Sequence, residues 1–357
     1  MKKITVLGGG KIGRMVGFLL GTSGDYQVHI GDSDAAAATA AAQIAKGSGS
    51  AVDFTSETQV MAAVSGAWAV VSCAPFHCNP LIASCAKAAG AHYFDLTEDV
   101  AVTKRVIELS SGARTVFAPQ CGLAPGFITI AANHLASPFS ALDTLRLRVG
   151  ALPMQPSNEL GYNLTWSTEG VINEYINECE AVQDGTLVRV PALEHEERLI
   201  IDGIEFEAFN TSGGLGTLAD SMRGKVRNLN YKTIRFPGHA RLMRFLLQEL
   251  RLSEHRDELR RILERALPST ANDQVVVFVS ASGVREGRLT ESSYAKRIGA
   301  RTIGGHHWTA IQITTAAGVC AIVDLVAQGK GAKAGLVRME DFRFDDFIAN
   351  RFGAHYA

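Results

Sequence analysis

The sequence predicts an α/β protein that joins a doubly wound parallel sheet of the Rossmann type to an α+β substrate-binding and dimerisation domain with a mainly antiparallel sheet. Residues 1–130 alternate short apolar strands with helical patterns, and the first strand runs into a glycine-rich turn. From Leu145 onward, alternating runs separated by turn residues replace that pattern. The 357 residues are also enough for two domains. We expect the Rossmann domain over 1–125, the second domain over 126–314, and a C-terminal segment, 315–357, that returns to the first domain.

Composition excludes several classes of function. Thirty-five basic residues against 36 acidic ones give a net charge of -1, so there is no positive field to attract nucleic acid or an anionic membrane. The apolar run after Lys3 is too short for a signal peptide, and the longest apolar stretch, 311–327, is interrupted by polar residues. Six cysteines without a C-x-x-C pair are typical of reduced thiols. We therefore expect a cytoplasmic protein with a small-molecule ligand.

A dinucleotide-binding motif opens the chain. Gly8, Gly10 and Gly13 form G-x-G-x-x-G between a strand at 3–7 and an apolar helical pattern, which is the context that the motif requires. A second strand, YQVHI, leads to Asp32, where a carboxylate can accept hydrogen bonds from the ribose hydroxyls of NAD and repel the 2′-phosphate of NADP. The sequence therefore favours NAD as the cofactor. The alternative is a surface aspartate at a strand end.

The alternation of strands and helices continues to about residue 119. Further strands are expected near 51–54, 67–73, 92–95 and 115–119, with helices at 34–46, 57–65 and 79–89 and one more between the last two strands. Six parallel strands of this kind predict the order 3-2-1-4-5-6, with ligands at their carboxyl ends.

The expected carboxyl ends carry polar and special residues. Together with the glycine turn they give these further cofactor-binding candidates: Lys11, Ile12, Ser33, Ser72, Cys73, Ala74, Pro75, Leu96 and Gly122. Phe76, His77 and Cys121 are substrate-binding candidates, and Asp95 is a candidate proton acceptor. His77 could equally be a solvated loop imidazole, and an inert buried thiol suits Cys121 better than a nucleophile.

The second half of the chain predicts a sheet covered by helices on one face. The expected strands are 145–149, 160–166, 186–190, 198–209 with an Asp202-Gly203 turn, 231–236, 274–281 and 306–314; the expected helices are 168–178 and 239–266. The tail from Thr315 is expected to form an apolar helix, followed by four phenylalanines that pack on the first domain. An apolar seam on the sheet suggests a homodimer.

Four separated segments resemble the saccharopine dehydrogenase family. CGLAPGFI at 121–128 resembles the glycine–proline turn that opens the linker helix of this family. YNLTWSTEGVINEY (162–175), EAFNTSGGLGTL (207–218) and YKTIRFPGHARLMRFLL (231–247) are similar in content, order and spacing to its lysine 6-dehydrogenase branch. The resemblance implies an NAD-dependent enzyme that removes a hydride from an amine-bearing carbon. In that branch the carbon is the ε-carbon of L-lysine, and the product cyclises to piperideine-6-carboxylate.

One residue separates the branches. The resemblance implies that saccharopine dehydrogenases carry an arginine just before the glycine of the TWS segment, where it holds the extra glutaryl carboxylate of saccharopine. This chain has Glu169 before Gly170 instead. A carboxylate cannot bind a second substrate carboxylate but suits an ammonium group, which favours lysine over saccharopine. Glu169 could instead be a first-turn carboxylate that interacts with the helix dipole.

The expected chemistry needs a proton acceptor and a carboxylate-binding group. Because hydride leaves a C–N carbon only when the nitrogen lone pair is free, an ammonium substrate must first lose a proton. Candidates are Glu169, Asp95 and His239. Arg235 and Lys232 could bind the substrate α-carboxylate, although Lys232 could equally be a surface lysine.

The remaining candidates are less specific. Trp166 could be core or a pocket wall, and Thr211 and Ser212 lie in an anion-binding turn or a simple loop. His306 and His307 are adjacent on an expected strand, so they point to opposite faces, and we assign no metal.

Three functions stay open at this point. The first is oxidation of L-lysine. The second is the same chemistry on saccharopine or on a carboxynorspermidine-type amine. The third is a non-catalytic NAD(P)-binding sensor.

Overall fold

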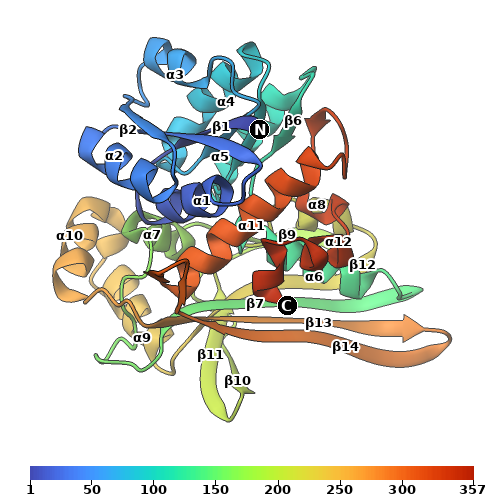
Figure 1. Ribbon diagram of the computed structural model, residues 1–357. Helices are drawn as coiled ribbons and strands as arrows, with labels where there is room; N and C mark the ends of the chain where they lie inside the picture. Colours follow the sequence, from blue (N-terminus) through green and yellow to red (C-terminus); the bar gives the residue numbers. More distant parts are fainter. The chain divides into compact units, whose positions relative to one another are not determined.

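The computed structural model describes residues 1–357 and divides into two compact units (Figure 1). Unit 1 comprises Met1–Ile130 and Gln312–Ala357, and unit 2 comprises Ala131–Ile311. The chain therefore leaves unit 1, builds unit 2 and returns.

Unit 1 is built on a seven-stranded sheet with the order β17-β6-β5-β4-β1-β2-β3. Its strands are β1 (Lys2–Leu7), β2 (Tyr26–Asp32), β3 (Ser48–Ala51), β4 (Ala69–Ser72), β5 (His92–Asp95), β6 (Val116–Ala118) and β17 (Gly335–Leu336). Every neighbouring pair is parallel. The predicted order of the first six strands is confirmed. The third strand begins three residues earlier than expected, and β17 is too short to show any sequence period.

Helices cover both faces of this sheet. They are α1 (Lys11–Gly21), α2 (Ala35–Ile44), α3 (Glu57–Val64), α4 (Asn79–Ala88) and α5 (Val100–Ser110). Side chains of α3, α4 and α5, including Val60, Ile82 and Val106, share one buried cluster with β1, β4 and β5. Several helices begin where the sequence supplies an N-cap: the Asp34 side chain accepts from Ala36 N, and that of Asp99 accepts from Val102 N.

The C-terminal segment completes unit 1. Helix α11 (Ala310–Ala327) begins five residues before the expected Thr315, and its Cys320 thiol contacts the carbonyl of Val16 in α1. The aromatic tail, with α12 (Phe344–Ala349), packs on the start of α6 (Phe127–Ala136): the ring centroids of Phe127 and Tyr356 are 3.9 Å apart. Helix α11 is long and apolar enough to cross a membrane, but 83% of it is buried inside the protein, as in a core helix.

Unit 2 holds an eight-stranded mixed sheet. Its strands are β7 (Ala141–Pro153), β8 (Cys179–Gln183), β9 (Thr186–Val190), β10 (Glu197–Ile201), β11 (Ile204–Asn210), β12 (Val226–Arg235), β13 (Asp273–Arg285) and β14 (Arg288–Gly299). Only β7 and β12 pair in parallel; the other pairs are antiparallel, as predicted. The Asp202-Gly203 turn between β10 and β11 has positive φ at both residues, which these residue types tolerate.

Several predicted elements of unit 2 were wrong. Residues 160–166 are irregular, because Gly161 takes a positive φ and Leu164 makes only an isolated bridge. Strand character in 306–314 is limited to β16 (His306–Trp308), which pairs with β15 (Arg301–Ile303). Strand β14 was missed because its exposed positions make it too polar to stand out.

The helices of unit 2 are shorter than expected. Helix α7 spans Thr168–Ile176 and α8 spans Leu218–Met222. The single helix expected at 239–266 is divided into α9 (His239–Arg244), a π turn, a 3₁₀ turn and α10 (Arg256–Ala266). The break lies at Arg251, whose φ of +55° a continuous helix cannot contain.

A buried ion network ties three strands of unit 2 together. Glu197 in β10 binds Arg148 in β7 and Lys232 in β12, with 2.7 Å between its Oε2 and the Lys232 Nζ. The Arg148 and Lys232 side chains are only 2% and 9% exposed. Neither cation has enough contact with water to be solvated without this carboxylate.

We predict that Glu197→Ala lowers the free energy of unfolding by about 2 to 3 kcal/mol, because it leaves two buried cations without their counter-charge. The control is Glu205→Ala, which breaks the exposed Arg198–Glu205 pair and should cost less than about 0.5 kcal/mol. Urea unfolding of both variants measures the difference. Equal losses would show that the network contributes no more than a surface ion pair.

Candidate functional site

The glycine turn after β1 leaves no room for larger residues at two of its positions. A Cβ on Gly8 would lie 2.5 Å from the carbonyl oxygen of Cys73, and one on Gly13 would lie 1.7 Å from that of Gly8. A Cβ on Gly10, by contrast, meets nothing within 4 Å. Gly8 and Gly13 therefore serve the packing of strand, turn and helix, whereas Gly10 leaves open space above the turn.

The start of α1 suits a phosphate group. Gly10 is its N-cap without a side-chain hydrogen bond, and the first turn, which begins with Lys11 and Ile12, has no acidic residue. The first backbone N–H groups and the positive end of the helix dipole are therefore available to an anion. Asp32 adjoins this turn, since its Oδ2 accepts from Gly9 N at 2.6 Å. These residues fit a dinucleotide: phosphates at the helix start, and a carboxylate beside them for the ribose.

Asp95 at the end of β5 holds neighbouring loops together. Its carboxylate is fully buried and accepts from Thr97 N, Gln120 N and the Tyr93 hydroxyl. Burial raises the pKa of Asp95 to about 6, against the opposing effect of these donors. Because the protein already supplies three donors, this environment favours a positioning residue over a proton acceptor.

The other candidates at the strand ends are placed unequally. Ser72 donates to Asn79 Oδ1 at 2.6 Å, and the thiol of buried Cys121 contacts the carbonyl of Ala118, which fits the inert interpretation of this cysteine. Burial raises the pKa of Cys73 to about 12. Six other candidates are exposed or half-buried: Ser33, Ala74, Pro75, Phe76, His77 and Leu96. Gly122 is buried, and its carbonyl accepts a hydrogen bond from Phe127 N.

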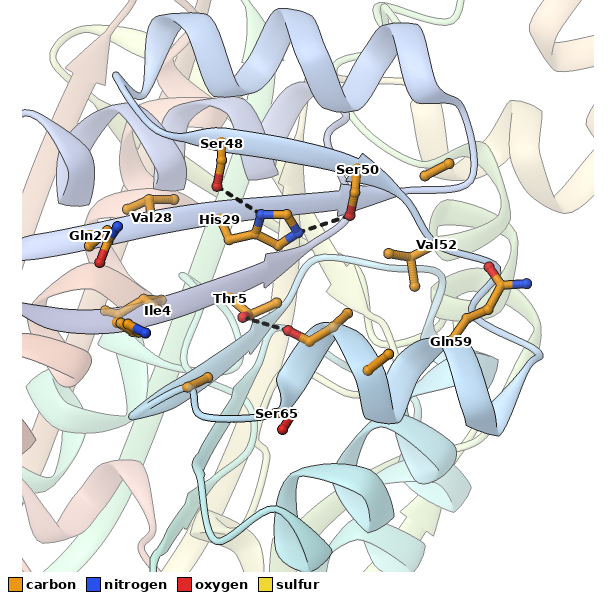
Figure 2. A pocket seen from close by; sticks show the side chains of 15 residues that line it. Ile4, Thr5, Gln27, Val28, His29, Ser48, Ser50, Val52, Gln59 and Ser65 are labelled. Atoms are coloured by element: carbon orange, nitrogen blue, oxygen red, sulfur yellow. Dashed lines mark hydrogen bonds between the residues drawn. The ribbon is translucent and has the colours of Figure 1, made fainter.

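A groove of about 500 Å³ lies beside β1, β2 and β3 in unit 1, and Figure 2 shows the side chains that line it. The His29 ring lies between two hydroxyl groups, at 2.9 Å from Ser48 Oγ and 2.9 Å from Ser50 Oγ. Thr5 donates to the carbonyl of Ala63. The groove contains neither the glycine turn nor Asp32, so we assign it no part in the cofactor site.

Unit 2 contains a buried hydrogen-bonded chain centred on Arg235. Its Nε donates to the Tyr175 hydroxyl at 2.9 Å, and that hydroxyl lies 2.9 Å from His239 Nε2. His239 Nδ1 faces the carbonyl of Leu160 at 2.8 Å, so Nδ1 carries the proton and Nε2 accepts from Tyr175. Burial, aided by the Arg235 charge, lowers the pKa of His239 to about 3. His239 is therefore neutral and occupied on both nitrogens, which does not suit a proton acceptor.

Glu174 Oε2 is buried beside this chain and has no hydrogen-bond partner. The Tyr162 hydroxyl and Thr165 Oγ1 are also buried; they interact with each other but make no hydrogen bond of good geometry. Burial raises the pKa of Glu174 to about 7, although the Arg235 charge opposes the shift. The guanidinium of Arg235 lies 4.9 Å from the centre of the Tyr162 ring. Unsatisfied buried polar groups are rare, and a buried carboxylate oxygen of this kind beside a buried cation indicates a ligand site.

Two further elements shape this cluster. The Thr211 hydroxyl pairs with that of Thr233 at 2.7 Å, and Ser212 N donates to the carbonyl of Glu174 at 3.0 Å. Trp166 is half-buried and packs on the apolar core around Tyr162 and Tyr175. Three of the four segments that resemble the saccharopine dehydrogenase family thus meet in one place.

Glu207 fixes the turn that follows Arg235. Its two carboxylate oxygens accept from Gly238 N at 2.7 Å and Ala240 N at 2.6 Å, and Gly238 has a φ of +98°. The carboxylate therefore holds the first amides of α9, which places His239 against Tyr175.

Glu169 lies elsewhere on α7. It is exposed in the first helical turn and lines a charged depression with Glu254 of the 3₁₀ turn and with residues of α10 that include Asp257 and Arg261. This placement fits the alternative interpretation, a first-turn carboxylate near the helix dipole.

Lys232 and Arg235 do not act together. They are three residues apart on β12, so their side chains point to opposite faces of the sheet. Lys232 donates to the carbonyl of His195 at 2.6 Å and pairs with Glu197, and it is buried rather than a surface lysine. Its capacity for hydrogen bonds is largely taken up by the protein.

The predicted site did not include Glu174, Tyr162, Tyr175 or Glu207. The available signal was in α7, where a carboxylate and a tyrosine occur on a helix whose residues 170–175 are all buried. A glutamate that must be buried needs a partner. Exposure of Glu169 and burial of Glu174 could not be distinguished without the helix's packing partners.

The glycine turn on a doubly wound sheet is the arrangement of a dinucleotide-binding enzyme, and the second unit adds a buried polar cluster to it. Two family models match the chain: the saccharopine dehydrogenase NADP binding domain at residues 4–117 and the saccharopine dehydrogenase C-terminal domain at residues 122–353. The chain belongs to the saccharopine dehydrogenase family.

A solved structure shares the fold of this chain. Apo saccharopine dehydrogenase (L-Glu forming) from Saccharomyces cerevisiae matches with a TM-score of 0.81 and 16% identity, over 97% of this chain and 96% of that one. C. glutamicum DAP dehydrogenase in complex with DAP matches with a TM-score of 0.48 and 11% identity, over 98% and 99%. Both family models are named for a dehydrogenase, which gives no support to a non-catalytic sensor, and the model of the first domain is named for NADP binding.

We predict that the glycines of the turn differ in effect. Gly10→Ala should cost no more than about 1 kcal/mol of stability but weaken cofactor binding by about 10-fold or more, because its methyl group enters the open space above the turn. Gly13→Ala should cost about 3 kcal/mol, because its methyl group overlaps the Gly8 carbonyl. Thermal melts and NADH fluorescence titrations separate the two. Unchanged cofactor affinity in Gly10→Ala would place the phosphates elsewhere.

The raised pKa of Glu174 predicts a stability effect with a definite sign. Between its unfolded value near 4.5 and its folded value of about 7, the native state keeps a proton that the unfolded state has lost, so this group destabilises the fold as pH rises. Glu174→Gln removes that contribution. The difference in melting temperature between Glu174→Gln and wild type should therefore grow by a few degrees from pH 5 to pH 8, in favour of the variant.

The matched control is Glu178→Gln, four residues along and exposed, which should show no such trend. A parallel pH profile of wild type and Glu174→Gln would refute the assignment.

Proposed function

We propose that this protein is an NAD-dependent amino acid dehydrogenase that oxidises an amine-bearing side-chain carbon, with the ε-carbon of L-lysine as its substrate carbon. The observation that carries the proposal is the buried Arg235, which makes protein hydrogen bonds through Nε and Nη1 but not through Nη2 and which lies near the unpartnered Glu174 Oε2. An arginine held in this way suits a substrate carboxylate, which it can bind through two parallel hydrogen bonds.

The residues divide the work between two sites. The amides at the start of α1 and the carboxylate of Asp32 would hold the dinucleotide, which accepts a hydride when bound. Arg235 would hold the α-carboxylate of the amino acid. The ammonium group of the substrate first gives a proton to water, which frees the nitrogen lone pair. The C–H bond of the reacting carbon then breaks, its electron pair leaves as the hydride, and the nitrogen lone pair forms the C=N bond. Water then releases ammonia, and the aldehyde, allysine, cyclises to piperideine-6-carboxylate.

The choice of lysine depends on the absence of a second carboxylate-binding group. The resemblance implies an arginine before Gly170 in saccharopine dehydrogenases, and this chain has Glu169 there, so that cation is missing. Lys232, the other candidate cation, is paired with Glu197. Saccharopine or a carboxynorspermidine-type amine would bring an additional carboxylate with no cation assigned to it.

The preference for NAD depends on Asp32. Its carboxylate lies at the end of β2 beside Gly9, where a 2′-phosphate on the ribose would meet a negative charge. The family model for this region is named for NADP. The proposed preference for NAD therefore rests on Asp32 of this chain and not on its family.

A substrate and cofactor panel tests the proposal. L-Lysine, L-ornithine, saccharopine and related diamines are assayed with NAD and with NADP by following the absorbance of the reduced cofactor. We expect the highest kcat/KM for L-lysine with NAD, by about 10-fold or more over the other combinations, and a smaller cofactor ratio in Asp32→Ala. Preference for saccharopine would reject the substrate, and preference for NADP would reject the role of Asp32.

A further inference from the structure

The buried cluster of unit 2 contains one cation and one carboxylate that are not bonded to each other. Arg235 uses its Nε on Tyr175 and its Nη1 on the carbonyl of Ile234. Glu174 has a buried carboxylate oxygen without any partner, and it interacts with Arg235 through its charge, not through a hydrogen bond. Both side chains are more than nine-tenths buried.

A carboxylate in this position costs free energy unless a donor reaches it. Burying a charge without hydrogen bonds is unfavourable, and a native protein that keeps such a group supplies its partner from a ligand or water. The Tyr162 and Thr165 hydroxyls are also buried in this cluster, where they interact with each other but make no hydrogen bond of good geometry. The cluster therefore offers donors for an anionic group beside an acceptor for a cationic one.

Those requirements describe a zwitterion. We propose that the cluster binds the whole α-amino acid head group, with the α-carboxylate on Arg235 and the α-ammonium on Glu174. This inference depends on the proposed function and extends it, because it makes the substrate class free α-amino acids that carry a second amine. A zwitterion adds no net charge to the buried site, and each of its charges meets an opposite one.

Geometry separates this role from a role at the reacting amine. Glu174 and Tyr175 are consecutive in α7, and Tyr175 accepts a hydrogen bond from Arg235, so the carboxylate and the guanidinium belong to one small cluster. In lysine the α-ammonium is attached to the carbon that carries the carboxylate, whereas the ε-amine lies at the end of a four-carbon stem. With the carboxylate on Arg235, the α-ammonium is the nearer cation to Glu174.

The first test measures binding without turnover. L-Norleucine has the α-amino acid head group but no side-chain amine, so its affinity for the full chain reports this site alone. We expect calorimetry to show binding to wild type, and about 100-fold weaker binding to Glu174→Gln and to Arg235→Gln. The exposed Glu178→Gln should bind as wild type does. Unchanged norleucine affinity in Glu174→Gln would overturn the proposal even if lysine is oxidised.

The second test uses kinetics. 6-Aminohexanoate keeps the carboxylate and the reacting amine of lysine but lacks the α-ammonium. We expect Glu174→Gln to lower kcat/KM about 100-fold for L-lysine and less than about 3-fold for 6-aminohexanoate. An equal loss on both would place Glu174 at the reacting amine and overturn the proposal. If neither compound is oxidised by wild type, the proposed function fails, while the norleucine measurement still decides the head-group site.

Discussion

The structure of unit 2 depends on burying the guanidinium of Arg235, which is only 2% exposed. A permanent charge inside a protein must be solvated by the protein, and here one tyrosine hydroxyl, one carbonyl and two aromatic rings perform that task. The same tyrosine, Tyr175, orients His239. The arrangement leaves part of the guanidinium without a protein partner, so the cation is held rigidly but is not neutralised.

Unit 1 follows a different constraint, which is close approach of the backbone. The glycines at the end of β1 admit the carbonyls of Cys73 and Gly8 into space that a Cβ would occupy, and the start of α1 is left without a side-chain cap. At the neighbouring strand ends, a buried aspartate accepts from three donors and joins two loops. The first unit thus presents backbone N–H groups, whereas the second presents side-chain charges.

The sequence predicts unit 1 better than unit 2 for a physical reason. Parallel strands buried on both faces give continuous apolar runs, and the glycine turn has a fixed spacing, so the first six strands and their order were predicted correctly. In unit 2, strand β14 is half exposed and polar, and residues 160–166 are apolar yet irregular. The burial of Glu174 and the pairing of Lys232 depend on tertiary neighbours, which no local pattern contains.

The central claim is that the buried Arg235 cluster receives the amino acid head group. A crystal structure with bound L-lysine and oxidised cofactor tests it most directly, because the orientation of lysine distinguishes its two ends. The account predicts the α-carboxylate on the Arg235 guanidinium and the α-ammonium within hydrogen-bond distance of Glu174, about 3 Å. Lysine bound with its ε-amine at Glu174, or bound away from Arg235 altogether, would contradict it.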